Sequence, residues 1–221
     1  MEDEERVERE LARLPIFPLP GAVLLPFTLV PLHVFEPRYR KMIRDCERGA
    51  GVLALANIPP DALSAGEHAP RVLPVLGAGL LARVEPLPDG RSNIVVRGAL
   101  RARIVEELPS GEPYRVVRAE RLPDRACDED RERTAAESLR RLVLAFCAAR
   151  PGADANALAQ MAARAERPGE LADVVAGAVV DSAVERQALL EQLSVGLRLA
   201  HLEAAVASAL ARSASPSSAR N

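Results

Sequence analysis

Hydrophobic positions follow two different patterns along this 221-residue chain. Between residues 14 and 123, short apolar runs such as GVLALANI and ALRARIVEEL are separated by Pro and Gly, which is typical of β-strands. Between residues 128 and 212, apolar residues recur every three or four positions among Ala, Arg and Glu, which is typical of amphipathic helices. The pattern therefore predicts an α+β fold, with a strand-rich first part and an all-α helical bundle after it.

The clearest local pattern in the first part is LLARVEPLPDGRSNIVVRG, where two β-rich segments flank Asp89 and Gly90. Asp-Gly tolerates the positive φ values of a tight turn, so this segment predicts a β-hairpin. Prolines interrupt LPIFPL and VPLHVF, and because proline has no N–H to donate, these runs belong at sheet edges or strand ends. Many short antiparallel strands within about 110 residues indicate a small barrel or sandwich.

One helix is expected inside the strand-rich part. Pro37 suits the first helical position, where its missing N–H would have no partner in any case. The next apolar residues recur with helical spacing, and glycines mark the expected end of the helix. These apolar residues are Tyr39, Met42, Ile43 and Cys46.

The second part predicts several helices joined by short connections, which implies antiparallel neighbours in a compact bundle. Their expected ranges are 128–150, 154–165 and 169–180, followed by a helix after Ser182 and another after Ser194. The expected division is a charged segment at residues 1–12, a strand-rich subdomain at 13–123, a helical bundle at 124–212 and a disordered tail at 213–221.

Composition and charge argue against some classes of protein. A net charge of -2 and an aromatic content of 3% do not fit a nucleic-acid-binding protein. The three cysteines are widely spaced without a C-x-x-C motif, which argues against a disulfide framework and fits a reducing cytoplasm. The charged start MEDEERVERELAR is not a signal peptide, and no apolar run of about 18 residues is present to span a membrane.

Motifs for catalysis are missing from the sequence. Lys41 is the only lysine and lies inside the expected helix, which excludes a P-loop. His33, His68 and His201 are far apart and show no spacing for a metal site. Cys46 and His33 flank the same segment, but Cys46 falls on the apolar side of the helix, where thiols are usually inert. We therefore expect no catalytic residue, no metal and no cofactor.

Several segments together resemble the N-terminal, substrate-recognition domain of the ATP-dependent Lon proteases. The resemblance covers roughly residues 14–210, and the combination of segments is more specific than any one of them. The segments are LPIFPLPGAVLLPFTLVPLHVFEPRYRKMIRDC, LLARVEPLPDGRSNIVVRGALRARIVE, LADVVAGAV and ERQALLEQLSVGLRLAHLEAAV.

This resemblance implies a PUA-like β-barrel with one internal helix, followed by a helical bundle. It also implies recognition of polypeptides, with unfolded or specific proteins as partners. In Lon proteases the ATPase and Ser–Lys protease domains follow this region, whereas here the sequence ends at Asn221 and has no P-loop. We therefore expect a stand-alone, non-catalytic member, with the oligomeric state left open.

The segment PLHVFEPRYRKMIRDC allows two interpretations. In the structural one, Glu36 caps the helix, Pro37 starts it and Tyr39 packs into the barrel, while Arg38 pairs with a carboxylate. In the functional one, polar residues beside the barrel and apolar residues of the preceding loop form a polypeptide-binding surface. Its candidate residues are His33, Arg38, Arg40, Leu24, Leu25 and Phe27.

Two further functions are kept open. PUA-like barrels elsewhere bind RNA, so a nucleic-acid-binding stripe of arginines is the main alternative, and it predicts steep salt dependence. An unrecognised enzyme or small-ligand pocket would need a deep cleft with converging polar groups. The arginines of the alternative stripe are Arg97, Arg101, Arg103, Arg115 and Arg118.

Overall fold

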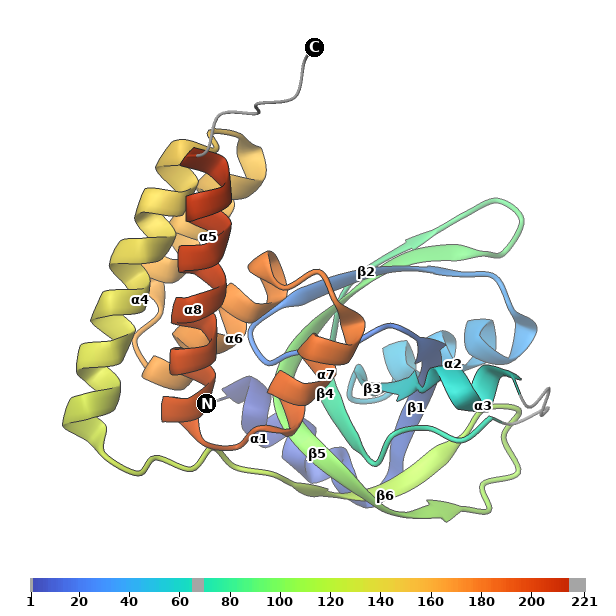
Figure 1. The fold of residues 1–221 in the computed structure, drawn as a ribbon. Coiled ribbons are helices and arrows are strands. Elements are labelled where there is room, and N and C mark those ends of the chain that lie inside the picture. Colours follow the sequence, from blue (N-terminus) through green and yellow to red (C-terminus); the bar gives the residue numbers. More distant parts are fainter. Residues whose placement is uncertain (1, 65–69, 215–221) are drawn as a thin grey trace. The chain divides into compact units, whose positions relative to one another are not determined.

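The computed structural model describes residues 2–64 and 70–214, which form two compact units (Figure 1). The sheet unit comprises Met1–Pro123 and Arg186–Glu191, and the helical unit comprises Asp124–Glu185 and Gln192–Asn221. His68 and residues 215–221 of the expected tail lie outside the described residues, whereas residues 213 and 214 end a helix. The α+β prediction is confirmed, with strands in the first part and helices after them.

The sheet unit holds six strands in the order β2-β5-β4-β3-β1-β6, and β6 also pairs with β5. The sheet therefore curls until β6 contacts both β1 and β5. β1 and β3 pair in parallel, unlike the antiparallel pairs that the short strands predicted, because β2 and α2 lie in the long connection between them. The elements are α1 (Glu2–Glu10), η1 (Leu11–Arg13), β1 (Leu14–Pro20), β2 (Leu29–Val34), α2 (Pro37–Arg48), β3 (Val52–Ile58), α3 (Pro60–Ser64), β4 (Val75–Pro86), β5 (Ser92–Leu108) and β6 (Val116–Arg121).

Two apolar cores hold this unit together, and β3 contributes to both. Every residue of β3 is buried, with Val52 and Ala54 in one core and Leu53 and Leu55 in the other. Alanines make up much of the first core, which lets helices and strands approach closely. The second core contains the apolar side of α2, as its helical spacing predicted.

The expected charged segment at the N-terminus is a docked helix. Val7 and Leu11 lie four residues apart and enter the first core, with exposed fractions of 0% and 6%. Acidic residues on the same helix bind arginines of the strands: Asp3 pairs with Arg97 at 2.6 Å, and Glu4 pairs with Arg121 at 2.7 Å. A segment with eight charged residues out of nine therefore belongs to the folded unit.

The helical unit contains α4 (Glu129–Ala149), α5 (Ala153–Arg164), α6 (Pro168–Val179) and α8 (Val195–Ala214). Asp128 caps α4 by accepting a hydrogen bond from the N–H of Arg131 at 3.1 Å. α7 (Ala183–Glu191) is divided, since its residues 186–191 belong to the sheet unit. There, Gln187 donates to the carbonyl of Val75 at 3.0 Å. None of the helices within the described ranges is both long and apolar enough to cross a bilayer.

Candidate functional site

The start of α2 is a packed corner of the sheet unit. Pro37 is the first residue of the helix, and Tyr39 is 4% exposed, with its ring 4.1 Å from that of Phe17. Glu36 does not cap the helix as expected, because its carboxylate accepts a hydrogen bond from Arg38 Nε at 2.8 Å instead. The guanidinium of Arg38 also lies over the Tyr39 ring, 4.5 Å from its centroid. Arg38 is thus engaged by the corner itself.

Further along α2, an ion-paired cluster holds the loop between β5 and β6. Lys41 Nζ lies 2.6 Å from carboxylate oxygens of both Asp45 and Glu112, and the Tyr114 hydroxyl donates to Asp45 at 2.9 Å. The hydrogen bond from Lys41 holds the pKa of Asp45 below its usual value of 3.8, with a further contribution from Tyr114. The only lysine of the chain therefore has a structural role.

Removing this carboxylate is expected to have a pH-dependent effect. Because the pKa of Asp45 is lowered by folding, its contribution to stability is present above pH 3.8 and is lost as the pH falls through the lowered value. We predict that Asp45→Asn lowers the melting temperature at pH 7 and that its gap from the wild type narrows below pH 3.8. Thermal melts from pH 2 to pH 7 test this, and an equal gap at every pH would contradict it.

The expected surface role of Leu24 and Leu25 is wrong in this structure, because both side chains are 0% exposed. The loop that carries them passes directly over Gly77 and Gly98, where a Cβ would collide with the carbonyl oxygens of Leu24 and Leu25. The two glycines thus make room for the loop to bury its leucines. Phe27 is half-buried at a positive φ of 63° and donates its N–H to Gly98 at 2.9 Å.

The exposed apolar side chains of this region lie instead on β2 and on the residue that directly follows it. Leu29, Pro31, His33 and Phe35 are exposed at alternate positions, and the residues between them turn towards the core. We call these four residues the β2 row. Leu29 is 60% exposed and Phe35 is 59% exposed, which places them among the most exposed large apolar side chains of the described residues. Only His33 among them was expected at the site, because strand alternation places the four residues on one face but the sequence LVPLHVF does not mark which face is exposed.

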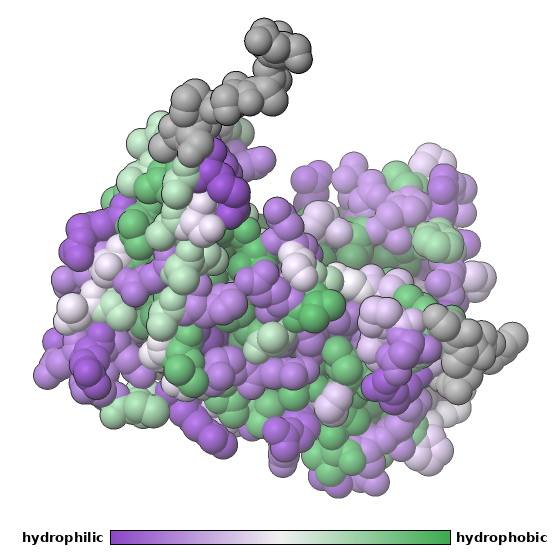
Figure 2. All heavy atoms as spheres, viewed as in Figure 1, coloured by the Kyte–Doolittle hydropathy of each residue, from purple (hydrophilic) through white to green (hydrophobic). Residues whose placement is uncertain are grey.

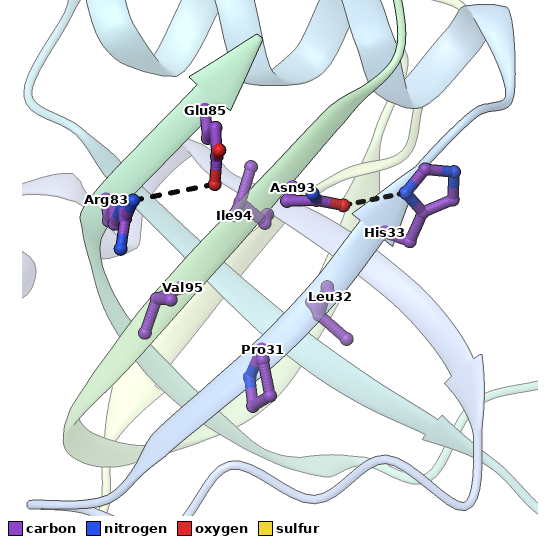
Figure 3. Close-up of a pocket in the computed structure, with 8 residues that line it drawn as sticks. All are labelled: Pro31, Leu32, His33, Arg83, Glu85, Asn93, Ile94 and Val95. Atoms are coloured by element: carbon purple, nitrogen blue, oxygen red, sulfur yellow. Dashed lines mark hydrogen bonds and ion pairs between the residues drawn. The ribbon is translucent and has the colours of Figure 1, made fainter. Parts of the chain in front are cut away.

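Two members of the β2 row, Pro31 and His33, line a shallow depression of about 300 Å³ on the face formed by β2, β5 and β4 (Figure 3). His33 points towards Asn93 on the neighbouring strand, with 2.8 Å between His33 Nδ1 and Asn93 Oδ1. Arg83 and Glu85 flank the other side as an ion pair at 3.6 Å. On the face visible in Figure 2, hydrophobic residues form small groups separated by hydrophilic ones. The depression is open and mixed in character, which suits a flexible ligand better than a small rigid one.

The arginines proposed for nucleic-acid binding are largely neutralised. Arg101 is 3% exposed and donates to the carbonyl of Leu190 at 3.0 Å. Three others pair with carboxylates, which leaves little free positive charge to release counterions from a phosphate backbone. These pairs are Arg97 with Asp3 at 2.6 Å, Arg115 with Glu107 at 2.7 Å and Arg118 with Glu106 at 2.7 Å. Of the five candidates, Arg103 is exposed without such a pair in the described structure.

The thiol of Cys46 is unsuited to nucleophilic chemistry. It is 5% exposed and donates to the carbonyl of Val52 at 3.3 Å. Burial raises its pKa to about 12, so the reactive thiolate is not populated at neutral pH. Across the described residues, no group of three or more His, Cys, Asp or Glu side chains is arranged to hold a metal ion.

Residues 13–206 match the family described as the ATP-dependent protease La (LON) substrate-binding domain. Because this match spans most of the sequence, the chain belongs to that family. The family membership that the sequence resemblance indicated is confirmed.

The chain is also similar in sequence to Lon proteases. The chain is 33% identical over 196 residues to the Lon protease of Chloroflexus aurantiacus, which covers 84% of this chain and 22% of that protein. It is 30% identical over 192 residues to the Lon protease of Anaeromyxobacter dehalogenans, covering 85% of this chain and 22% of that protein. The chain thus corresponds to about a fifth of the length of these relatives.

Solved structures show the same fold. The N-terminal domain of Mycobacterium avium complex Lon protease matches with a TM-score of 0.70 and 21% identity, covering 88% of this chain and 98% of that one. A Lon N-terminal domain protein from Xanthomonas campestris matches with a TM-score of 0.59 and 22% identity, covering 87% and 97%. At these identities the likeness concerns the fold alone.

Proposed function

We propose that the chain is a non-catalytic recognition module that binds polypeptide segments along the β2 row of its sheet unit. The observation that carries this proposal is the exposure of Leu29 and Phe35 at the two ends of one strand face. Apolar side chains exposed in a row offer an unfolded segment contacts that its own folded state would otherwise provide. Membership of a substrate-binding domain family supports a protein ligand.

We expect a polypeptide to bind through contacts with the side chains of the β2 row, and not as an extra strand that pairs with the edge of β2. β2 stands at one end of the strand order and pairs with β5. Pro31 lies in the middle of β2 and has no N–H to offer an added strand, a feature that commonly protects sheet edges. A bound segment would therefore lie across the side chains of the β2 row, where specificity comes from apolar contact and from the polar groups beside it.

Replacing both apolar ends of the β2 row should weaken polypeptide binding strongly. We predict that Leu29→Ser combined with Phe35→Ser lowers affinity for a labelled, permanently unfolded polypeptide by about tenfold or more, since burying each such side chain stabilises a complex by about 1.5–3 kcal/mol. Fluorescence anisotropy at low and high salt measures the effect, which should persist at high salt because the contacts are apolar.

Leu197 provides the matched control, since it is also 59% exposed but belongs to the helical unit. Leu197→Ser should leave the affinity unchanged, and both proteins should keep the melting temperature of the wild type. An equal loss of polypeptide affinity in the β2-row variant and in Leu197→Ser would show that binding depends on general hydrophobicity. An unchanged affinity of the β2-row variant would refute the proposed surface. Salt-sensitive binding of a labelled RNA without polypeptide binding would favour the nucleic-acid alternative instead.

A further inference from the structure

Arg40 differs from the other cations beside the β2 row in having no carboxylate of its own. Arg38 pairs with Glu36 at 2.8 Å and Arg91 pairs with Asp89 at 2.6 Å, whereas Arg40 makes no ion pair within the described ranges. Its Nε atom is buried and has no hydrogen-bond partner there. A guanidinium with an unused donor gains more from a new acceptor than one that is already paired.

The position of Arg40 is fixed by the turn between β4 and β5. Its guanidinium packs directly over Gly90, where an added Cβ would lie 3.0 Å from Arg40 Cζ. Gly90 has a φ of 79°, so one glycine both forms the turn and leaves space for the arginine. Arg40 is therefore held at this turn by packing, without a charge to neutralise it.

A series of contacts connects this turn to the β2 row. Arg91, the neighbour of Gly90, places Nη1 3.4 Å from His33 Nε2. The rings of His33 and Phe35 are stacked, with 6.2 Å between their centroids. The unpaired charge of Arg40 thus lies at the same end of the sheet as the exposed aromatic end of the β2 row.

We propose that Arg40 is a subsite for the side-chain carboxylate of an Asp or Glu in a polypeptide bound along the β2 row. This inference rests on the proposed function and adds a preference to it: an apolar segment that carries an acidic residue. The planar guanidinium presents parallel N–H donors that match the two oxygens of a carboxylate.

The free C-terminus of a polypeptide is a poorer fit than an acidic side chain. Terminal carboxylates are usually captured by several backbone N–H groups that point at one spot. At this turn those groups are already used, because Gly90 donates to Leu87 at 2.9 Å and Arg91 donates to the Asp89 side chain at 3.0 Å. The donors left at this turn belong to the half-buried side chain of Arg40, and because its Nε is buried, an internal Asp or Glu would approach the Nη groups.

The test compares two labelled, C-terminally amidated peptides of the same apolar sequence, one with a single Glu and one with Gln in its place. We expect the wild-type protein to bind the Glu peptide about fivefold more tightly, the size of a single exposed ion pair. In Arg40→Gln the two peptides should bind equally. Arg44→Gln is the matched control, since Arg44 is exposed one turn further along the same helix, and it should keep the full preference.

The outcomes separate this inference from the proposed function. Equal binding of both peptides to the wild type would overturn the carboxylate subsite, and that comparison needs no variant that must fold. If the variant Leu29→Ser with Phe35→Ser still binds both peptides more weakly than the wild type does, the proposed binding face is supported. If neither the Glu peptide nor the Gln peptide bound to the wild type, both the subsite and the proposed binding face would be overturned. A preference that appears only with peptides that have a free C-terminus would overturn the side-chain assignment.

Discussion

Replacement of Arg198 by Met is expected to lower the free energy of unfolding of the helical unit by about 3–5 kcal/mol, the usual result of breaking a buried ion pair on one side. Arg198 is 1% exposed and binds both oxygens of Asp124 at 2.8 Å. Its Nε also lies 3.7 Å from Asp173, which is itself 1% exposed. Without the guanidinium, the Asp173 carboxylate stays in the interior and loses a positively charged neighbour.

A second substitution distinguishes the loss of an ion pair from simple loss of packing. The double variant Arg198→Met with Asp173→Leu also removes the buried carboxylate and should recover much of the lost stability, because apolar replacements of buried ion pairs are often neutral. Asp124 is tolerated in this variant since its side chain is 37% exposed and can be hydrated. Urea unfolding followed by circular dichroism measures each step, with hydrogen exchange in α6 and α8 to localise it.

The control for Arg198 is Arg212→Met on the same helix, where the side chain is exposed and bonds to Ser208 at 2.9 Å. We expect a change of less than about 0.5 kcal/mol for this substitution. A loss below about 1 kcal/mol for Arg198→Met itself would mean that water or other polar groups replace the guanidinium, contrary to the expected cost of a buried charge.

Features that depend on neighbouring residues were predictable from the sequence. The Asp89-Gly90 turn is present. Gly90 has a φ of 79°, and the N–H of Leu87 donates a hydrogen bond to the carbonyl of Arg91 at 2.8 Å. α2 begins at Pro37 and buries its predicted apolar stripe. The start of α4 after Asp128 follows from a cap that lies within one turn of the helix. In each case the required partner is only a few residues away.

Features that depend on residues far apart in the chain were not predictable from the sequence. Leu24 looks like part of an exposed loop until Gly77 and Gly98, far along the chain, are seen to leave space beneath it. The burial of Val7 likewise depends on strands that follow much later in the sequence. For the candidate site, sequence reasoning found His33 and Arg40 but missed Leu29 and Phe35, because exposure depends on which face of the sheet the core covers.

Truncation of Leu24 should distinguish between two roles for this residue: contact with a bound polypeptide, which the sequence predicted, and packing in the core, which the structure shows. Leu24 is 0% exposed and belongs to the core that also holds Tyr39 and Met42. We predict that Leu24→Ala lowers the free energy of unfolding by about 2–5 kcal/mol, through lost burial and the cavity that remains. Polypeptide affinity, measured at a temperature where the variant is folded, should be close to that of the wild type.

Leu29→Ala is the matched comparison, because the same atoms are removed from a side chain that is 60% exposed. Its effect on unfolding should stay within about 0.5 kcal/mol, whereas its affinity for an unfolded polypeptide should fall. The two leucines therefore give opposite results in two assays, urea unfolding and fluorescence anisotropy. A stable Leu24→Ala protein with reduced affinity would restore the loop as the binding surface, and it would show that the leucine leaves the core when a polypeptide binds.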